Sequence, residues 1–245
     1  MNRTSDYDFT VIVPLYDEEA NIPELGRRLA AFLRTSQYRS CVLFVNDGSS
    51  DGSLECVKKT CSGYPDFFYI SFSENCGLSA ALKAGFDYAC SEYVGYMDAD
   101  LQTDPEDFNL LLPYLRDYDM VTGVRVRRND SPFRRFQSVF ANSFRRMMTG
   151  DGASDTGCPL KVFRTAAARS FPIFTGMHRF FPALIMLQNG AGYKEVPVRH
   201  YPRTAGVSKF SMWNRVLVSL ADCFAYRWMK SRYIRYRVTD SDLER

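Results

Sequence analysis

The chain has 245 residues, of which 46% are hydrophobic and 15% aromatic, and its net charge is +3. This length and hydrophobic content suffice for the core of one large α/β domain, with or without a small extension. The sequence shows no internal repeat or low-complexity segment. The net charge hides an asymmetry, because residues 1–124 carry 9 basic and 20 acidic side chains, whereas residues 125–245 carry 22 and 8. The basic half lacks a helix-turn-helix, RRM or zinc pattern, so we expect no nucleic-acid partner and favour an anionic membrane surface.

The cysteines and the first residues indicate a compartment. Seven cysteines, an odd number, are scattered without the spacing of a disulfide framework, which favours reduced thiols in the cytosol. Residues 1–8 are polar and acidic, unlike a signal peptide, and no segment approaches the roughly 20 apolar residues of a transmembrane helix. We therefore expect a cytoplasmic protein whose membrane contact is peripheral, on the inner face of the cytoplasmic membrane.

Three apolar segments in the first half are predicted as strands, and each runs into a polar, acidic turn. The strands are Phe9–Val13, Cys41–Val45 and Tyr93–Met97, followed by turns at 14–19, 46–53 and 98–102. Helical patterns separate them at Asn21–Arg34, Ser53–Cys61 and Leu78–Tyr88. Strands that alternate with helices predict βαβ units and a mostly parallel sheet, so the fold class is α/β. Because ligands bind beyond the carboxyl ends of such strands, we expect the three turns to converge on one crevice.

The turn Asp98-Ala99-Asp100-Leu101-Gln102 is the strongest candidate for a metal site. Two carboxylates one residue apart at the exit of a buried strand repel each other and resist desolvation. A hard cation such as Mg²⁺ or Mn²⁺ removes both penalties and can bridge to substrate phosphates. The alternative is a solvated acidic loop, but the acidic turn at 46–53 in an equivalent position favours the metal.

The second half begins with a predicted strand, Met120–Arg125, whose last residue is an arginine. Arginines at 127, 128, 134 and 135 follow, and Phe136–Met148 has apolar residues at the spacing of a helix, which would pack on the core or on lipid. The planar guanidinium group of arginine suits phosphate oxygens. The alternative is that these are surface arginines paired with nearby acids.

The segment Trp213–Tyr236 is predicted to be an amphipathic helix. Leu217, Leu220, Phe224 and Trp228 fall on one helical face. The basic residues around that face are Arg215, Arg227, Lys230, Arg232, Arg235 and Arg237. Such a helix can lie in a membrane interface, although packing on the core or a dimer contact would produce the same pattern. We accordingly divide the chain into a domain at 1–212 and a helical extension with a basic tail at 213–245.

Six segments of the chain form an ordered set of motifs: Pro14–Glu19, Asn46–Asp51, Asp98–Gln102, Asp155–Lys161, Gly176–Arg179 and Arg203–Lys209. Taken together, they resemble family 2 glycosyltransferases with the GT-A fold. The resemblance is greatest to the branch of dolichol-phosphate mannosyltransferases and undecaprenyl-phosphate glycosyltransferases, and it covers about residues 8–230. The Gln-x-x-Arg-Trp motif of processive synthases is absent, which favours transfer of a single sugar.

The resemblance implies a metal-dependent, inverting transfer from a UDP- or GDP-linked sugar to a polyprenyl phosphate, for synthesis of cell-envelope glycans. It implies donor contacts from Pro14, Tyr16, Glu18, Asp47 and Asp98. It also implies that Asp98, Asp100 and Gln102 hold Mg²⁺ or Mn²⁺ on the diphosphate.

On the acceptor side, the resemblance implies that Arg125 and Arg135 hold the acceptor phosphate. Arg203 and Lys209 would lie on a lid that adds positive charge at the diphosphate, or on an ordinary surface loop. Asp155 would orient the sugar or acceptor, act as a base, or simply form a turn. A phosphate monoester is already ionised near neutral pH, since its second pKa is about 6, and it needs little help from a base.

Two rival functions stay open at this point. A glycosyltransferase of the same fold could act on a glycan hydroxyl, which would require Asp155 or a neighbour as a true base. A non-catalytic subunit could bind nucleotide sugars without turnover. His178 would contact the acceptor or serve as a structural histidine, and a homo-oligomer is compatible with the sequence.

Overall fold

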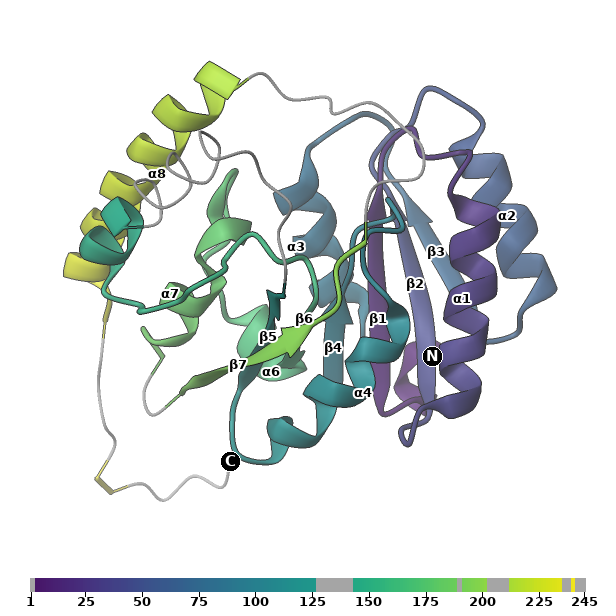
Figure 1. Ribbon diagram of the computed structural model, residues 1–245, viewed down its shortest axis with the longest axis horizontal. Coiled ribbons are helices and arrows are strands. Elements are labelled where there is room, and N and C mark those ends of the chain that lie inside the picture. The colour runs from purple at the N-terminus through teal and green to yellow at the C-terminus, as the bar shows by residue number, and fades with distance from the viewer. Residues whose placement is uncertain (1–2, 127–142, 189–190, 202–211, 235–238, 241–245) are drawn as a thin grey trace.

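The computed structural model describes residues 3–126, 143–188, 191–201, 212–234 and 239–240, with only the backbone of 212–219. One mixed sheet of seven strands forms its centre, in the order β3-β2-β1-β4-β6-β5-β7 (Figure 1). The strands are β1 (Phe9–Leu15), β2 (Ser40–Asn46), β3 (Phe67–Ser71), β4 (Tyr93–Tyr96), β5 (Met120–Arg125), β6 (Lys161–Arg164) and β7 (Tyr193–Val198).

The sheet is mostly parallel, as predicted. Strands β3, β2, β1 and β4 run in one direction, and β6 is antiparallel to both β4 and β5. Strand β5 therefore points the same way as β4, and β7 pairs parallel to β5. All four strands predicted from the sequence are present, and Met120–Arg125 has the predicted bounds. The sequence patterns did not identify β3, β6 or β7.

Helices cover both faces of this sheet. The α-helices are α1 (Ile22–Thr35), α2 (Ser53–Gly63), α3 (Leu78–Tyr88), α4 (Phe108–Leu111), α6 (Thr165–Arg169), α7 (Phe181–Ile185) and α8 (Met212–Arg232). Residues 143–149 are also helical. The described residues also form four short 3₁₀ helices: η1 (Arg3–Asp6), η2 (Pro105–Asp107), η3 (Leu112–Arg116) and η4 (Met177–Phe180).

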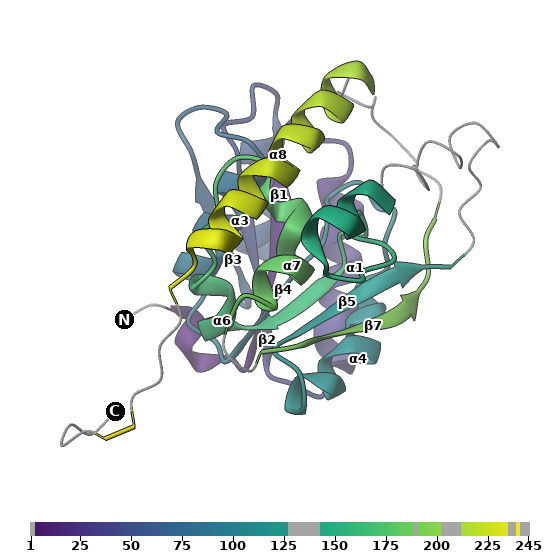
Figure 2. The ribbon, with the colours of Figure 1, turned by 90° about the vertical axis from the view of Figure 1, so that its left-hand side faces the viewer.

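Two hydrophobic cores result, one on each face. Side chains of α1, α2 and α4 pack on one face, and those of α3, α6, α7 and α8 pack on the other, so α2 and α8 lie at opposite sides of the molecule (Figures 1 and 2). Alternation along β1 explains this division, since Val11 and Val13 belong to the first core and Ile12 to the second. Strands buried on both faces appear in sequence as continuous apolar runs, which is why these strands were recognisable.

The C-terminal helix α8 packs on the second core through Cys223 and Tyr226, which lie outside the predicted apolar stripe. Cys223 and Tyr226 are buried, and the Tyr226 hydroxyl donates to the Ala183 carbonyl of α7 at 3.1 Å. Phe224 and Trp228 of the stripe are 62% and 68% exposed. Within the described part of the chain, no helix combines the length and apolar character needed to cross a membrane.

Candidate functional site

The turns that follow β1 and β2 meet, as the sequence predicts for neighbouring parallel strands. The Asp17 amide donates to the Ser49 hydroxyl at 2.9 Å, and the Asp17 carboxylate accepts from the Ser50 amide at 2.8 Å. The Glu18 amide donates to the Ser53 hydroxyl at 2.8 Å. Asp17 adopts a left-handed conformation with φ of 49°, which is uncommon for a residue other than glycine. These contacts join the two turns at the carboxyl edge of the sheet, where the sequence predicts a crevice.

Asp47 lies in the turn after β2 and its side chain is buried. Its carboxylate accepts from the amides of Cys76 and Gly77, at 2.7 and 2.9 Å, and from the Asn75 side chain at 3.1 Å. Burial raises the pKa of Asp47, and the two amides counteract part of that effect. Asp47 therefore attaches the start of α3 to the turn after β2. Gly48 is required beside it, because a Cβ there would lie 2.2 Å from the Glu74 carbonyl carbon.

The other residues predicted to contact the donor lie along the same edge. Pro14 is buried within β1, and Tyr16 is partly exposed just after it. The Glu18 carboxylate accepts from the Asn21 side-chain amide at 2.6 Å. The structure thus brings Pro14, Tyr16 and Glu18 to the turn that meets Asp47.

Asp98 and Asp100 follow β4, the neighbour of β1, so their turn reaches the same edge. Asp100 is buried, and its carboxylate accepts from the Gln102 amide at 3.1 Å. Leu101 has a φ of 62°, an unfavourable conformation for a branched side chain. Gln102 and Tyr201 are joined twice, since the Tyr201 amide donates to the Gln102 carbonyl at 2.9 Å and the Gln102 side chain donates to the Tyr201 carbonyl at 3.4 Å. The segment after β7 thereby holds this turn in place.

The donor set in this turn fits a hard divalent cation. Asp98 and Asp100 offer carboxylate oxygens and Gln102 offers an amide oxygen, the ligand type that Mg²⁺ and Mn²⁺ prefer. Among the residues that the structure describes, no group of three or more acidic, cysteine or histidine side chains is arranged to hold a metal.

Arg125 and Asp155 form a two-pronged ion pair at the same edge. The guanidinium Nε and Nη2 donate to the two carboxylate oxygens at 2.8 and 2.7 Å, and the Arg125 amide donates to one of them at 3.2 Å. Burial raises the pKa of Asp155, but the hydrogen bonds and charge of Arg125 outweigh it, so the pKa lies below its usual value. Gly157 makes room for the pair, because a Cβ there would lie 2.9 Å from Arg125 Nη2.

Comparison with known proteins identifies the family. The family model described as Glycosyl transferase family 2 matches residues 10–171. The chain belongs to glycosyltransferase family 2. This assignment confirms the resemblance given by the sequence motifs, and residues 10–171 contain every residue of the site described above except Tyr201.

Two relatives illustrate the branch of the family. This glycosyltransferase is 31% identical over 232 residues to a dodecaprenyl-phosphate galacturonate synthase of Rhizobium johnstonii. The alignment covers 92% of this chain and 69% of that protein. It is 32% identical over 205 residues to an undecaprenyl-phosphate 4-deoxy-4-formamido-L-arabinose transferase of Pseudomonas fluorescens. That alignment covers 82% of this chain and 60% of the relative. The chain thus spans about two thirds of the length of these relatives.

Solved structures show the same fold at low identity. A mannosyltransferase of Pyrobaculum calidifontis, in complex with GDP-mannose and Mn²⁺, aligns with a TM-score of 0.62 at 21% identity, over 94% of this chain and 65% of that one. A mannosyl-3-phosphoglycerate synthase of Rubrobacter xylanophilus aligns with a TM-score of 0.70 at 13% identity, over 96% and 78%. At these identities the likeness shows the fold alone, which is the predicted GT-A arrangement.

His178 of this glycosyltransferase has a structural environment. Its Nδ1 lies 2.8 Å from the hydroxyl of Ser79 in the first turn of α3, and that hydroxyl also accepts from the Gly176 amide at 3.1 Å. Burial, reinforced by the positive charges of Arg179 and Lys161, lowers the pKa of His178 to about 3. The imidazole is therefore neutral near pH 7, and these contacts favour the structural alternative over contact with the acceptor.

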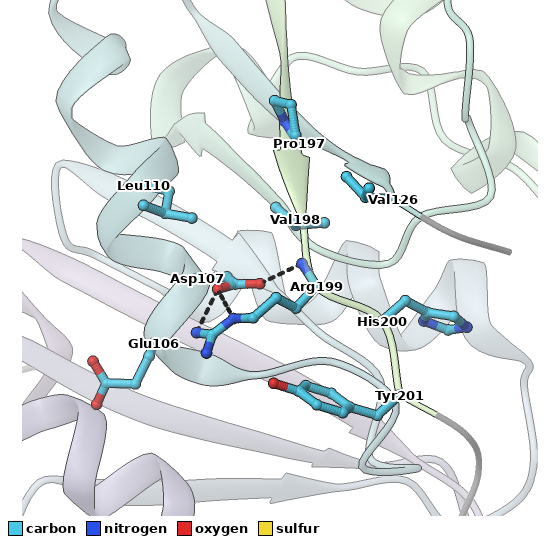
Figure 3. A pocket seen from close by; sticks show the side chains of 9 residues that line it. All are labelled: Glu106, Asp107, Leu110, Val126, Pro197, Val198, Arg199, His200 and Tyr201. Atoms are coloured by element: carbon cyan, nitrogen blue, oxygen red, sulfur yellow. Dashed lines mark hydrogen bonds and ion pairs between the residues drawn. The ribbon is translucent and has the colours of Figure 1, made fainter.

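Arg199 and Asp107 form a second two-pronged ion pair, which no sequence pattern indicated. Their nitrogen and oxygen atoms approach to 2.7 Å across 92 residues of chain, and the Arg199 amide donates to the same carboxylate at 2.8 Å. Figure 3 shows them facing each other beside a pocket lined by Leu110 and Val198. None of the predicted site residues that the structure describes lines this pocket. This ion pair links the end of β7 to η2. It lies close in sequence to Tyr201, which is hydrogen-bonded to Gln102.

Three predicted site residues, Arg135, Arg203 and Lys209, lie outside the described residues, as do Arg127, Arg128 and Arg134. Lys161, fully buried between the Asp98 turn and the Asp155 loop, is a residue of the site to which the sequence patterns assigned no role.

Proposed function

We propose that this family 2 glycosyltransferase moves one sugar from a nucleotide-diphosphate sugar to a polyprenyl phosphate, with inversion at the anomeric carbon. The observation that carries the proposal is the convergence of four features at one sheet edge. These are the turns after β1, β2 and β4, and the Arg125–Asp155 pair at the end of β5. The polyprenyl acceptors named for the two relatives of Rhizobium and Pseudomonas support the choice of acceptor.

The donor would lie across the crevice between the turns after β1 and β2. Pro14, Tyr16 and Glu18 would form one side of the nucleoside site. Asp47 would act by holding the Asn75–Gly77 turn at the correct place, since its oxygens already accept from that segment. Hydrogen-bonding groups that are already held in place need little reorganisation free energy when the ligand binds.

The carboxylates of Asp98 and Asp100, with Gln102, would hold Mg²⁺ or Mn²⁺ against the diphosphate. The bound ion would neutralise the negative charge that develops on the departing nucleoside diphosphate. The protein residues restrict where that diphosphate can sit, because Asp100 and Gln102 are fixed by hydrogen bonds within the turn and to Tyr201.

The Arg125–Asp155 pair favours a phosphate acceptor over a glycan hydroxyl. A hydroxyl acceptor needs a base, whereas Asp155 is a weak base because Arg125 holds its pKa low. A phosphate monoester, with a second pKa of about 6, is already a nucleophile near neutral pH. We assign Asp155 the role of orienting Arg125, whose guanidinium group would bind the acceptor phosphate together with Arg135.

We further propose that α8 rests on the cytoplasmic face of an anionic membrane. Phe224 and Trp228 are exposed and stand four residues apart, so they project from one side of the helix. Arg227, Lys230 and Arg232 are also exposed. Aromatic side chains with basic neighbours suit a membrane interface, and each basic residue near an anionic surface contributes roughly 1 kcal/mol. This surface would bring the crevice to a lipid-linked acceptor.

The test is sugar transfer from a panel of radiolabelled UDP- and GDP-sugars to undecaprenyl phosphate in mixed micelles. We expect label to enter a lipid that mild acid releases, and expect EDTA to abolish this. Nucleotide binding without lipid labelling by any donor would refute the proposal. In that case, labelling of a glycan would support the hydroxyl-acceptor function, and no labelling at all would support a non-catalytic nucleotide-sugar-binding subunit.

A further inference from the structure

Lys161, the first residue of β6, is a lysine in the interior of the protein. It is 1% exposed, whereas lysine side chains are almost never fully buried unless they are paired. Its ammonium group donates to the carbonyls of Cys158 and Thr156, the latter at 3.3 Å, and to the Tyr96 hydroxyl at 3.2 Å. An ammonium group has three protons, so these three acceptors use all of them.

The acceptors of Lys161 belong to the two halves of the site. Tyr96 is the last residue of β4 and stands two residues before Asp98. Thr156 and Cys158 belong to the loop that begins at Asp155, the partner of Arg125. The ammonium group therefore links the turn predicted to bind metal with the loop that holds the ion pair on the acceptor side.

The positive charge of Lys161 interacts with carboxylates from both halves of the site. Burial lowers the pKa of Lys161, while the nearby carboxylates of Asp155 and Asp98 favour its charged form. Removal of an ammonium group from water costs several kcal/mol even when it is paired, so a lysine is an expensive choice for an interior position. An uncharged side chain of similar length, such as methionine, would fill the same space without that cost.

The sheet itself does not require this charge. The backbone of Lys161 already pairs with Tyr96 of β4 and Thr122 of β5, which sets the register of β6. What the ammonium group adds is the attachment of two loop carbonyls, at Thr156 and Cys158, to the side chain at the end of β4.

We propose that Lys161 is a positioning residue. Its buried ammonium group holds the Arg125–Asp155 pair at a fixed position relative to the turn that carries Asp98 and Asp100. This inference rests on the proposed function for its kinetic consequence, but its structural part does not. The ammonium group sets the distance between acceptor and donor sites, and its positive charge weakens the attraction of Asp98 for a divalent cation.

The experiment compares Lys161→Met, which keeps the length and removes the charge, with Lys161→Arg, which keeps the charge. Lys194→Met is the matched control, since Lys194 lies on β7 with its ammonium group over the Tyr114 ring, away from the crevice. Three kinds of measurement are made on each protein. These are kcat and KM for undecaprenyl phosphate, the dissociation constant for Mn²⁺ with and without UDP or GDP, and amide hydrogen exchange across residues 153–160.

We expect Lys161→Met to lower kcat/KM for undecaprenyl phosphate by about tenfold or more, mainly through KM, because the Arg125–Asp155 pair is displaced. The same variant should bind Mn²⁺ at least as tightly as the wild type, and its 153–160 amides should exchange faster while those of β2 do not. Lys161→Arg should retain more transfer than Lys161→Met. Lys194→Met should match the wild type in all three measurements.

Equal transfer and equal exchange in Lys161→Met and wild type would overturn the proposal. So would a parallel loss of transfer, Mn²⁺ binding and thermal stability in both Lys161 variants, because that result would mean a requirement for folding alone. If the wild type transfers no sugar to undecaprenyl phosphate, the proposed function fails, yet Mn²⁺ binding and hydrogen exchange still decide the positioning role of Lys161.

Discussion

Arg125 and Asp155 face each other at the carboxyl edge of the sheet, joined by two parallel hydrogen bonds of 2.7 and 2.8 Å. Arg125 ends a strand that runs parallel to β4, so this pair and the Asp98 turn open onto the same side of the molecule. A bidentate pair fixes the plane of the guanidinium group as well as its position. The Asp155 carboxylate is therefore already paired with Arg125 before any substrate binds.

The first prediction separates orientation from base catalysis. Asp155→Asn should keep measurable transfer, reduced by about tenfold, because an amide still accepts one hydrogen bond from Arg125. Arg125→Lys should raise KM for undecaprenyl phosphate by about tenfold, because lysine cannot form the two-pronged contact. Arg116→Lys is the control, because Arg116 ends η3, which precedes the start of β5. Steady-state kinetics with both substrates measure these effects, and complete loss of turnover in Asp155→Asn alone would show that Asp155 is a base.

The second prediction concerns the metal. Asp100→Ala should lower transfer by about a hundredfold or more and raise the Mn²⁺ dissociation constant, because one of two carboxylate ligands is lost. EDTA should abolish transfer by the wild type, and Mn²⁺ or Mg²⁺ should restore it. Asp117→Ala, which removes an acid before β5 at the far end of the sheet, should leave both quantities unchanged. Unaltered metal dependence in Asp100→Ala would mean that the ion binds elsewhere.

The elements that the sequence identified share one property, which is strong local periodicity. Continuous apolar strands and the helix Leu78–Tyr88 were found with nearly the observed bounds, because burial on both sheet faces leaves a clear pattern. Strand β6 was not found, because it has four residues and begins with Lys161, which sequence rules place on the surface. Its antiparallel direction depends on pairing with β4 and β5, which no local pattern encodes.

The same distinction applies to the candidate site. Acidic turns after parallel strands predicted where Asp47 and Asp98 would lie, because sheet geometry alone brings those positions together. The partners of each side chain could not be predicted. That Asp47 would accept from the amides of Cys76 and Gly77, or that Arg199 would pair with Asp107, depends on contacts between segments 29 to 92 residues apart.

The third prediction tests the membrane surface. Phe224→Ser combined with Trp228→Ser should lower binding to vesicles that contain anionic phospholipid by about tenfold, because two aromatic side chains no longer enter the interface. Tyr88→Ser combined with Leu110→Ser is the matched control, since both residues are exposed but neither lies on α8. Co-sedimentation with vesicles measures binding, and raised salt should weaken it in the wild type. Equal binding by the double variant and the wild type would exclude this face of α8.

The last prediction uses the buried imidazole of His178. In the folded protein its pKa is lowered to about 3, whereas an unfolded histidine has a pKa of about 6.5. Between these values the unfolded chain takes up a proton that the folded protein does not, so the free energy of unfolding should fall as pH decreases from about 6.5 towards 3. His178→Gln removes this difference and can keep a hydrogen bond to Ser79.

The variant should be less stable than the wild type at about pH 7.5, by roughly 1 kcal/mol, but should lose less stability on acidification to about pH 5. Chemical denaturation at several pH values measures both quantities. Parallel curves of unfolding free energy against pH for the two proteins would mean that folded His178 takes up the proton as readily as the unfolded chain. That result would place the imidazole in contact with water, and would reopen the alternative in which His178 contacts the acceptor.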